Sequence, residues 1–185
     1  MMSDAEIREY LADMRRRETG LWNVDPPDGE YLHALVKELN ATRVLEIGTS
    51  NGYSGIWLAM ALRETGGRLT TLEADRGRWE LAQGHFRDTG LAALIDSRLT
   101  DANSELLRIE GPLDIAFLDA QKEDYSRQYD ALLPKVRRGG VIIAHNVISH
   151  ADQVRDFLAR VQSDPAVETE VVTPGPQGFS VSRVR

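Results

Sequence analysis

Two glycines that follow a short apolar run form the motif with the clearest chemical meaning. Residues 44–54 read VLEIGTSNGYS, with Gly48 and Gly52 at the turn into an amphipathic stretch. A strand that ends in glycine can turn sharply and let a ligand approach its backbone, and the free amides of the next helix can bind a polar group. The spacing G-x-x-x-G differs from the G-x-G-x-x-G of dinucleotide sites, and Glu46 would repel a pyrophosphate. We therefore predict a ligand with a cationic amine or sulfonium, although an ordinary strand-to-helix turn would also explain the glycines.

Acidic residues follow the second and third apolar runs. Glu73 ends the second run, where a carboxylate can accept hydrogen bonds from both ribose hydroxyls of a nucleoside. Asp75 is better explained as the N-cap of the following helix. Asp101, after the third run, either borders an adenine or caps its own helix, and the sequence leaves both open.

Residues suited to acid–base chemistry follow the fourth and fifth runs. Asp119 and Lys122 come after the fourth run, and His145 with Asn146 comes after the fifth. Ligands of open parallel sheets bind outside the carboxyl ends of the strands, so these side chains should face one crevice.

The elements that must position these residues alternate along the chain. The apolar runs are Val44–Ile47, Leu69–Leu72, Ile95–Leu99, Ile115–Leu118 and Val141–Ala144, and the helical stretches are Tyr53–Leu62, Arg76–Thr89, Ala102–Ile109, Glu123–Leu133 and Ala151–Val161. Such alternation implies right-handed crossovers and a parallel sheet covered on both faces. Val167–Thr173 and Phe179–Val184 follow without a helix between them. We predict an α/β fold, a Rossmann-like, doubly wound, mostly parallel seven-stranded sheet with a C-terminal antiparallel hairpin.

Two helices should precede the first strand. Ser3 to Arg17 has helical spacing, Pro26-Pro27 breaks the chain, and Asp28 is predicted to cap the second helix. We expect one domain over residues 1–185, with an N-terminal helical segment at 1–40 and the ligand-binding core at 41–185.

Composition excludes several classes of protein. The 185 residues carry a net charge of −7, which argues against nucleic acid as a partner. The chain has no cysteine, so disulfides and thiolate chemistry are excluded. No apolar stretch is long enough to span a bilayer, and the polar N-terminus does not have the pattern of a signal peptide. We expect a soluble cytoplasmic protein that does not bind membranes.

Several of these motifs together resemble one enzyme family. The strings LEIGT at 45–49, GYS at 52–54, FLDA at 117–120 and GFSV at 178–181, with Glu73 and Asn146-Val147, are similar to the small-molecule O-methyltransferases of the catechol and caffeoyl-coenzyme A type. The resemblance covers Asp28 to the C-terminus and implies S-adenosylmethionine as the cofactor. Carried over to this sequence, the resemblance implies cofactor binding by Glu46, Gly48, Thr49, Ser50, Gly52, Tyr53, Ser54, Glu73, Ala74, Asp101, Ala102 and, through the cofactor amine, Asp119.

The resemblance also implies a catalytic site. In the family an aspartate and an Asp-Asn pair coordinate a divalent cation that binds a catechol-like acceptor, and a lysine takes the acceptor proton. The matching residues are Asp119, Lys122, His145 and Asn146, with His145 in place of the family's aspartate. Imidazole would shift a metal preference from magnesium toward zinc, iron, manganese or nickel. His145 is therefore a transition-metal ligand, a general base in a metal-free site, or a hydrogen-bonding residue at a strand end, while Lys122 is either the base or a solvent-facing charge.

Three functions remain open on the sequence. The leading hypothesis is O-methylation of a small hydroxylated, catechol-like or phenolic acceptor. The alternatives are N-methylation of a small amine and a non-catalytic module that binds S-adenosylmethionine. The family resemblance alone implies a homodimer, through an exposed hairpin containing Phe179 or through the N-terminal helix. The three tryptophans are expected to be packing residues, with a substrate cage as the alternative.

Overall fold

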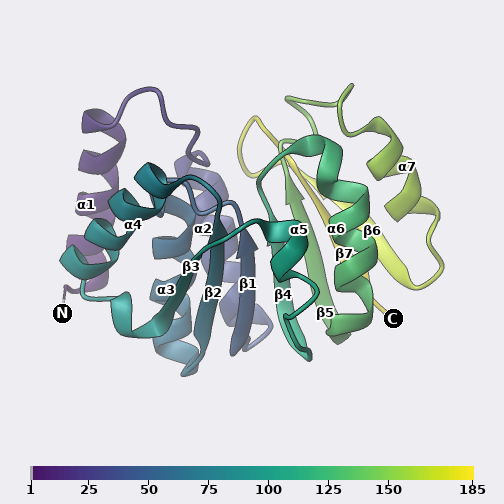
Figure 1. The fold of residues 1–185 in the computed structure, drawn as a ribbon, viewed down its shortest axis with the longest axis horizontal. Coiled ribbons are helices and arrows are strands. Elements are labelled where there is room, and N and C mark those ends of the chain that lie inside the picture. The colour runs from purple at the N-terminus through teal and green to yellow at the C-terminus, as the bar shows by residue number, and fades with distance from the viewer. Residues whose placement is uncertain (1) are drawn as a thin grey trace.

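A seven-stranded sheet in the order β3-β2-β1-β4-β5-β7-β6 runs through the computed structural model, which describes residues 2–185 (Figure 1). The strands are β1 (Arg43–Ile47), β2 (Arg68–Glu73), β3 (Ile95–Leu99), β4 (Leu113–Leu118), β5 (Val136–His145), β6 (Val167–Val172) and β7 (Phe179–Val184). β1 to β5 pair in parallel, and β7 is antiparallel to both of its neighbours. The predicted fold class, with its C-terminal hairpin, is confirmed.

Helices cover both faces of this sheet. On one face lie α1 (Asp4–Arg17), α2 (Pro26–Glu38), α3 (Tyr53–Thr65) and α4 (Arg76–Asp88), and on the other lie α5 (Ala102–Glu105), α6 (Tyr125–Leu132) and α7 (Arg155–Ser163). Single 3-10 turns lie at Ala92–Leu94, Lys122–Asp124 and Leu133–Lys135. Alternate residues of each buried strand enter the two cores, so Val44 packs with α1–α4 while Leu45 packs with α5–α7. Among the described residues, no helix is long and apolar enough to cross a membrane.

The chain changes faces of the sheet between β3 and β4. β1, the first strand, therefore has β2 on one side and β4 on the other. Adjacent loops diverge at such a switch point, and the crevice opens at the carboxyl ends of β1 and β4. The glycine motif follows β1 and Asp119 follows β4, so the fold brings these two predicted parts of the site together.

Several predicted boundaries differ from the structure. α5 has four residues instead of the eight of Ala102–Ile109, and α7 begins at Arg155 instead of Ala151 because residues 146–154 form hydrogen-bonded turns. β5 begins at Val136, which pairs with Leu113 across an irregular register, and not at Val141.

The start of α2 also corrects a prediction. Asp25 is the N-cap, and Pro26 and Pro27 occupy the first helical positions, where their missing N–H groups cost nothing. Asp28 therefore lies inside the first turn of α2, where its side chain is fully buried.

Candidate active site

A cavity of about 1070 Å³ opens at the carboxyl ends of the central strands. One side of its wall contains Gly48, Ser50, Glu73, Ala74, Asp101 and Ala102, and the other contains Asp119, Lys122, His145 and Asn146. The cavity thus joins the predicted cofactor residues to the predicted catalytic residues.

Glu73 is fixed on the cavity wall by backbone amides. Its Oε2 accepts from the amide of Ser50 at 2.8 Å, and its Oε1 accepts from Ala74 at 3.1 Å and Asp75 at 2.9 Å. A carboxylate has about four lone-pair positions, so three amides leave room for a further donor. Glu73 is therefore preorganised to accept a hydroxyl hydrogen in the cavity.

Gly48 is required by its backbone conformation and by its neighbours. Its φ is +101°, and a Cβ there would lie 2.3 Å from the carbonyl oxygen of Asp119. The missing side chain thus lets the loop after β1 lie directly against the end of β4. A side chain at position 48 would therefore strain the turn and collide with the backbone after β4.

Five predicted cofactor residues lie behind the cavity wall instead of on it. These are Glu46, Thr49, Gly52, Tyr53 and Ser54, all of them buried. Glu46 accepts from Ser54 Oγ and from Thr71 Oγ1, each at 2.6 Å, and burial raises the pKa of Glu46 to about 7. These residues shape the loop from behind the cavity wall, and their predicted contact with the cofactor stays a prediction.

Asp101 combines the two roles that the sequence left open. Its side chain accepts from the amide of Ser104 at 2.9 Å, which makes it the N-cap of α5, and it also lines the cavity. Asp75 caps α4 as predicted, through the amide of Arg78 at 2.8 Å.

Lys122 is enclosed by acceptors on the other side of the cavity. Its Nζ donates to Asp119 Oδ1 at 3.2 Å, to the carbonyl of Ala120 at 3.2 Å and to the hydroxyl of Tyr125 at 2.8 Å. Three acceptors match the three hydrogens of an ammonium. Lys122 is therefore enclosed by hydrogen-bond acceptors, and it is not the solvent-facing charge of the alternative prediction.

His145 lies between two carboxylates. Its Nδ1 is 3.2 Å from Asp119 Oδ2, and its Nε2 is 3.1 Å from Asp28 Oδ2. Burial opposes protonation of the ring, but Asp119 and Asp28 outweigh it and raise the pKa of His145 to about 9. Burial also favours the neutral acid of Asp119, yet His145 and Lys122 hold the pKa of that carboxyl below its usual range.

This geometry favours the third of the three hypotheses for His145. A metal ligand or a general base needs a lone pair on one ring nitrogen, whereas both nitrogens here face carboxylate oxygens. Asn146, the third predicted metal ligand, donates through its side-chain nitrogen to Gln177 and to Ser149, and these contacts do not involve its oxygen. Asp119 and His145 do not fit a divalent cation in this arrangement, and His145 is a hydrogen-bonding residue.

Sequence reasoning missed two contributions from the N-terminal segment. Asp28 reaches His145, as described above, and the loop at residues 18–25 forms much of the remaining cavity wall. In that loop Trp22 is 86% exposed, so the prediction that it packs is wrong, whereas Trp57 is buried as expected. The exposure of Trp22 could not be predicted, because the residues around it show no hydrophobic periodicity that would distinguish an exposed side chain from a buried one.

Phe179, predicted to lie in an exposed hairpin, is instead a core residue. Phe179 is fully buried and stacks on Tyr31, with ring centroids 5.6 Å apart. Its ring therefore packs inside the chain and is not available to a partner.

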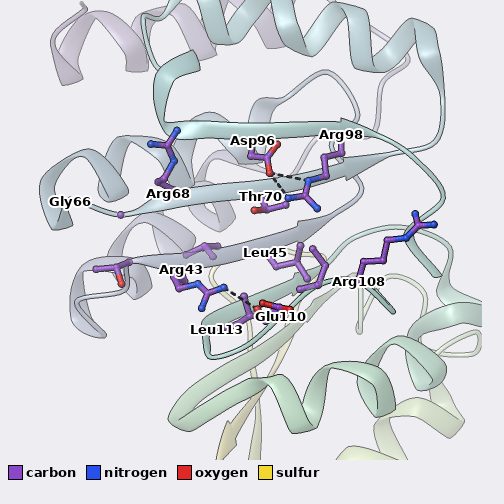
Figure 2. Close-up of a pocket in the computed structure, with 14 residues that line it drawn as sticks. Arg43, Leu45, Gly66, Arg68, Thr70, Asp96, Arg98, Arg108, Glu110 and Leu113 are labelled. Atoms are coloured by element: carbon purple, nitrogen blue, oxygen red, sulfur yellow. Dashed lines mark hydrogen bonds and ion pairs between the residues drawn. The ribbon is translucent and has the colours of Figure 1, made fainter. Parts of the chain in front are cut away.

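A second cavity, of about 590 Å³, lies at the amino ends of the strands (Figure 2). Its arginines are paired locally: Arg98 contacts Asp96 at 2.5 Å, and Arg43 donates to the carbonyl of Glu110 at 2.9 Å (Figure 2). The predicted site residues come from the opposite ends of the strands, so this cavity is separate from the candidate active site.

Known proteins are similar to this chain in sequence and in fold. The sequence model of the O-methyltransferase family matches residues 2–172. A catechol O-methyltransferase of Mycobacterium tuberculosis is 36% identical over 98% of this chain and 90% of its own length. A catechol O-methyltransferase of Niastella koreensis is 37% identical over 79% of this chain, which spans only 66% of that relative. The structure of the O-methyltransferase TomG from Streptomyces achromogenes, solved in complex with SAM, superposes with a TM-score of 0.85 at 29% identity over 99% of this chain and 91% of its own. This chain belongs to the O-methyltransferase family.

Proposed function

We propose that the chain transfers a methyl group from S-adenosylmethionine to an oxygen atom of a small hydroxylated acceptor. The observation that carries this proposal is the single cavity that joins Glu73 and the Gly48 loop to Asp119 and Lys122. Family membership and the SAM complex of the TomG neighbour support the choice of cofactor. The exposed indole of Trp22 on the cavity wall favours an aromatic acceptor, such as a catechol or phenol, which could stack on it.

The residues of this chain position the two reactants. The nucleoside side of the cofactor is held by Ser50, Glu73, Ala74, Asp101 and Ala102. Gly48 lies at its methionine end, and Asp119 can pair with its amine. The C–S bond of the sulfonium breaks as the O–C bond forms, so alignment of the two groups supplies much of the rate.

The acceptor hydroxyl must lose its proton, and Lys122 governs that step. Because its nitrogen contacts three acceptors, we propose that Lys122 acts as a fixed charge and not as the base that the family resemblance implies. Instead its charge stabilises the acceptor oxyanion, while the proton leaves to solvent in the open cavity. We also propose a cytoplasmic location, which suits a chain without cysteine.

Calorimetric titration of Glu73→Gln with S-adenosylhomocysteine tests the cofactor site. Loss of hydrogen bonds to a carboxylate costs about 1.5–3 kcal/mol, so the affinity should fall about 10- to 150-fold. Glu80→Gln, an exposed substitution on α4, is the matched control and should bind like the wild type. Unchanged affinity of Glu73→Gln would contradict the proposed nucleoside contact.

An acceptor panel tests the reaction. Catechols, phenols and amines are incubated with S-adenosylmethionine, and the methylated products are identified by mass spectrometry. We expect methyl transfer to hydroxylated aromatic compounds. Transfer to amines alone would move the reaction to nitrogen, and cofactor binding without any transfer would favour a binding module.

A further inference from the structure

Four charged side chains of alternating sign form one continuous chain beside the cavity. Asp28 contacts His145 at 3.1 Å, His145 contacts Asp119 at 3.2 Å, and Asp119 contacts Lys122 at 3.2 Å. They come from α2, the end of β5, the residue after β4 and the turn before α6. Asp28 and His145 are almost completely buried, so their charges are compensated by each other and not by water.

We propose that this chain of ion pairs takes the place of a divalent cation, so that the enzyme works without a metal between Asp119, His145 and Asn146. The inference rests on the proposed function, because it concerns how the same active site holds its acceptor-side residues. The proposed reaction needs no step through a metal, since a positive charge from Lys122 already faces the cavity.

The hydrogen bonds of His145 carry the first step of the argument. Each of its ring nitrogens lies within hydrogen-bonding distance of a carboxylate oxygen, so both nitrogens are directed at protein groups and neither is free to bind a metal ion. The ring is also fixed against Phe179, with centroids 4.8 Å apart, which opposes rotation toward the cavity. His145 thus occupies the position of a family ligand without being able to act as one.

The charge around Asp119 carries the second step. One oxygen of this carboxylate accepts from Lys122 and the other from His145, two cationic groups. A divalent ion bound to either oxygen would lie beside these two cationic groups and would be repelled by them at short range. Metal binding would therefore add two positive charges to a set of contacts that is already neutral overall.

Asp28 is the positioning residue of the set. It is fully buried, and besides His145 it binds the amide of Gly175 at 2.8 Å, where a Cβ would lie 2.7 Å from its carboxylate oxygen. The first turn of α2 and the loop between β6 and β7 therefore hold Asp28 against His145. Removal of the Asp28 carboxylate would take away one of the two groups that favour the protonated imidazole of His145. The positive charge beside Asp119 would then be weaker.

A manganese titration tests the proposal without any acceptor. Free Mn²⁺ is followed by electron paramagnetic resonance while it is added to metal-stripped wild type, to the double variant Asp28→Asn/His145→Asp and to His150→Asp. We expect no binding by the wild type at millimolar Mn²⁺. The affinity of the double variant for Mn²⁺ should be more than about tenfold higher, because a carboxylate that can bind the metal replaces the cationic His145. His150→Asp places a carboxylate elsewhere on the cavity wall and should behave like the wild type.

The wild-type measurements decide the outcome even if the double variant does not fold. Stoichiometric Mn²⁺ binding by the wild type that is lost in Asp119→Asn would overturn the proposal. So would methyl transfer that stops in chelator and returns with Mg²⁺ or Mn²⁺. Turnover unchanged by chelator, together with no Mn²⁺ binding, supports it. If no acceptor in the panel is methylated, the proposed function is contradicted. The present inference is then tested by the manganese titration alone, which needs no acceptor.

Discussion

Glu46 shows how burial changes the role of a side chain in the glycine motif. Its carboxylate is fully enclosed and accepts hydrogen bonds from Ser54 and Thr71, which connect β1, β2 and the start of α3. Two hydroxyl donors only partly replace water, so burial raises the pKa of Glu46 to about 7. Glu46 therefore supports the loop between β1 and α3, and its contribution to the free energy of unfolding depends on pH.

Substitution of Glu46 should change the pH dependence of stability. The folded carboxyl has a pKa of about 7 and the unfolded one a pKa near 4.5, so the folded state binds more protons between these values. The free energy of unfolding should accordingly fall, by about 3 kcal/mol in all, as pH rises from about 4.5 to 7. Urea unfolding across that range should show this loss in the wild type and little of it in Glu46→Gln.

The same measurement separates Glu46 from His145. The pKa of His145 is raised to about 9, so its contribution to stability is fully present below about 6.5 and is lost as pH rises through 9. Data below pH 6.5 therefore report mainly on Glu46. An exposed substitution, Glu80→Gln, should leave the wild-type slope unchanged. An equal slope in Glu46→Gln would show that this carboxyl titrates normally.

The residue types at the strand ends were enough to predict much of the site. The contacts that could not be predicted join residues that are far apart in the sequence. Glu73, Asp119, Lys122 and His145 share one cavity because parallel strands end at the same edge. Asp28 was assigned to a helix cap because its local neighbours fit that role. Its actual partner, His145, is 117 positions away, and no local pattern records such a pair.

The loop between β1 and α3 depends on close contact with the end of β4. Gly48→Ala should destabilise the protein by about 2–5 kcal/mol, through the positive φ and the contact with the Asp119 carbonyl. It should also weaken cofactor binding, because Ser50 and Glu73 depend on the same loop. Urea unfolding and calorimetry measure the two effects.

Gly84→Ala is the matched control for Gly48→Ala. It lies within α4, where a Cβ would have nothing within 4 Å, so alanine should stabilise the helix by about 0.5–1 kcal/mol. Equal stability of the two variants would show that the loop can move away from β4 without penalty.

The loop at residues 18–25 should act on the acceptor and not on the cofactor. Trp22→Ala removes an exposed aromatic surface from the cavity wall, and an aromatic contact is worth about 0.5–1.5 kcal/mol. We expect KM for an aromatic acceptor to rise about 2- to 10-fold, with an unchanged Kd for S-adenosylhomocysteine. Leu107→Ala, an equally exposed position that is not on the wall of this cavity, serves as control. A change in the affinity for the cofactor, with no change in KM for the acceptor, would show that Trp22 contacts the cofactor instead of the acceptor.

At the scale of the whole molecule, the alternation of strands and helices was enough to predict the mostly parallel sheet and its C-terminal hairpin. Element ends were less predictable where turns replace a helix, as at residues 146–154, because hydrogen-bonded turns and helices share the same residue types. The sequence also gave no sign that the N-terminal helices and the last hairpin meet at the site. Asp28 and Gly175 make that connection, which ties both ends of the chain to Asp119 through His145.

Cofactor binding should therefore stabilise the whole fold against heat. A ligand at 100 times its Kd adds about 2.7 kcal/mol to the folded state, which for a chain of 185 residues raises Tm by about 5–11 °C. We expect this shift with S-adenosylhomocysteine in differential scanning fluorimetry, and a smaller shift at the same concentration in Glu73→Gln. NAD should give none, because Glu73, Asp101 and Asp119 on the cavity wall repel its pyrophosphate. A comparable shift with NAD would mean that the cavity accepts phosphates, and the cofactor assignment would then have to be revised.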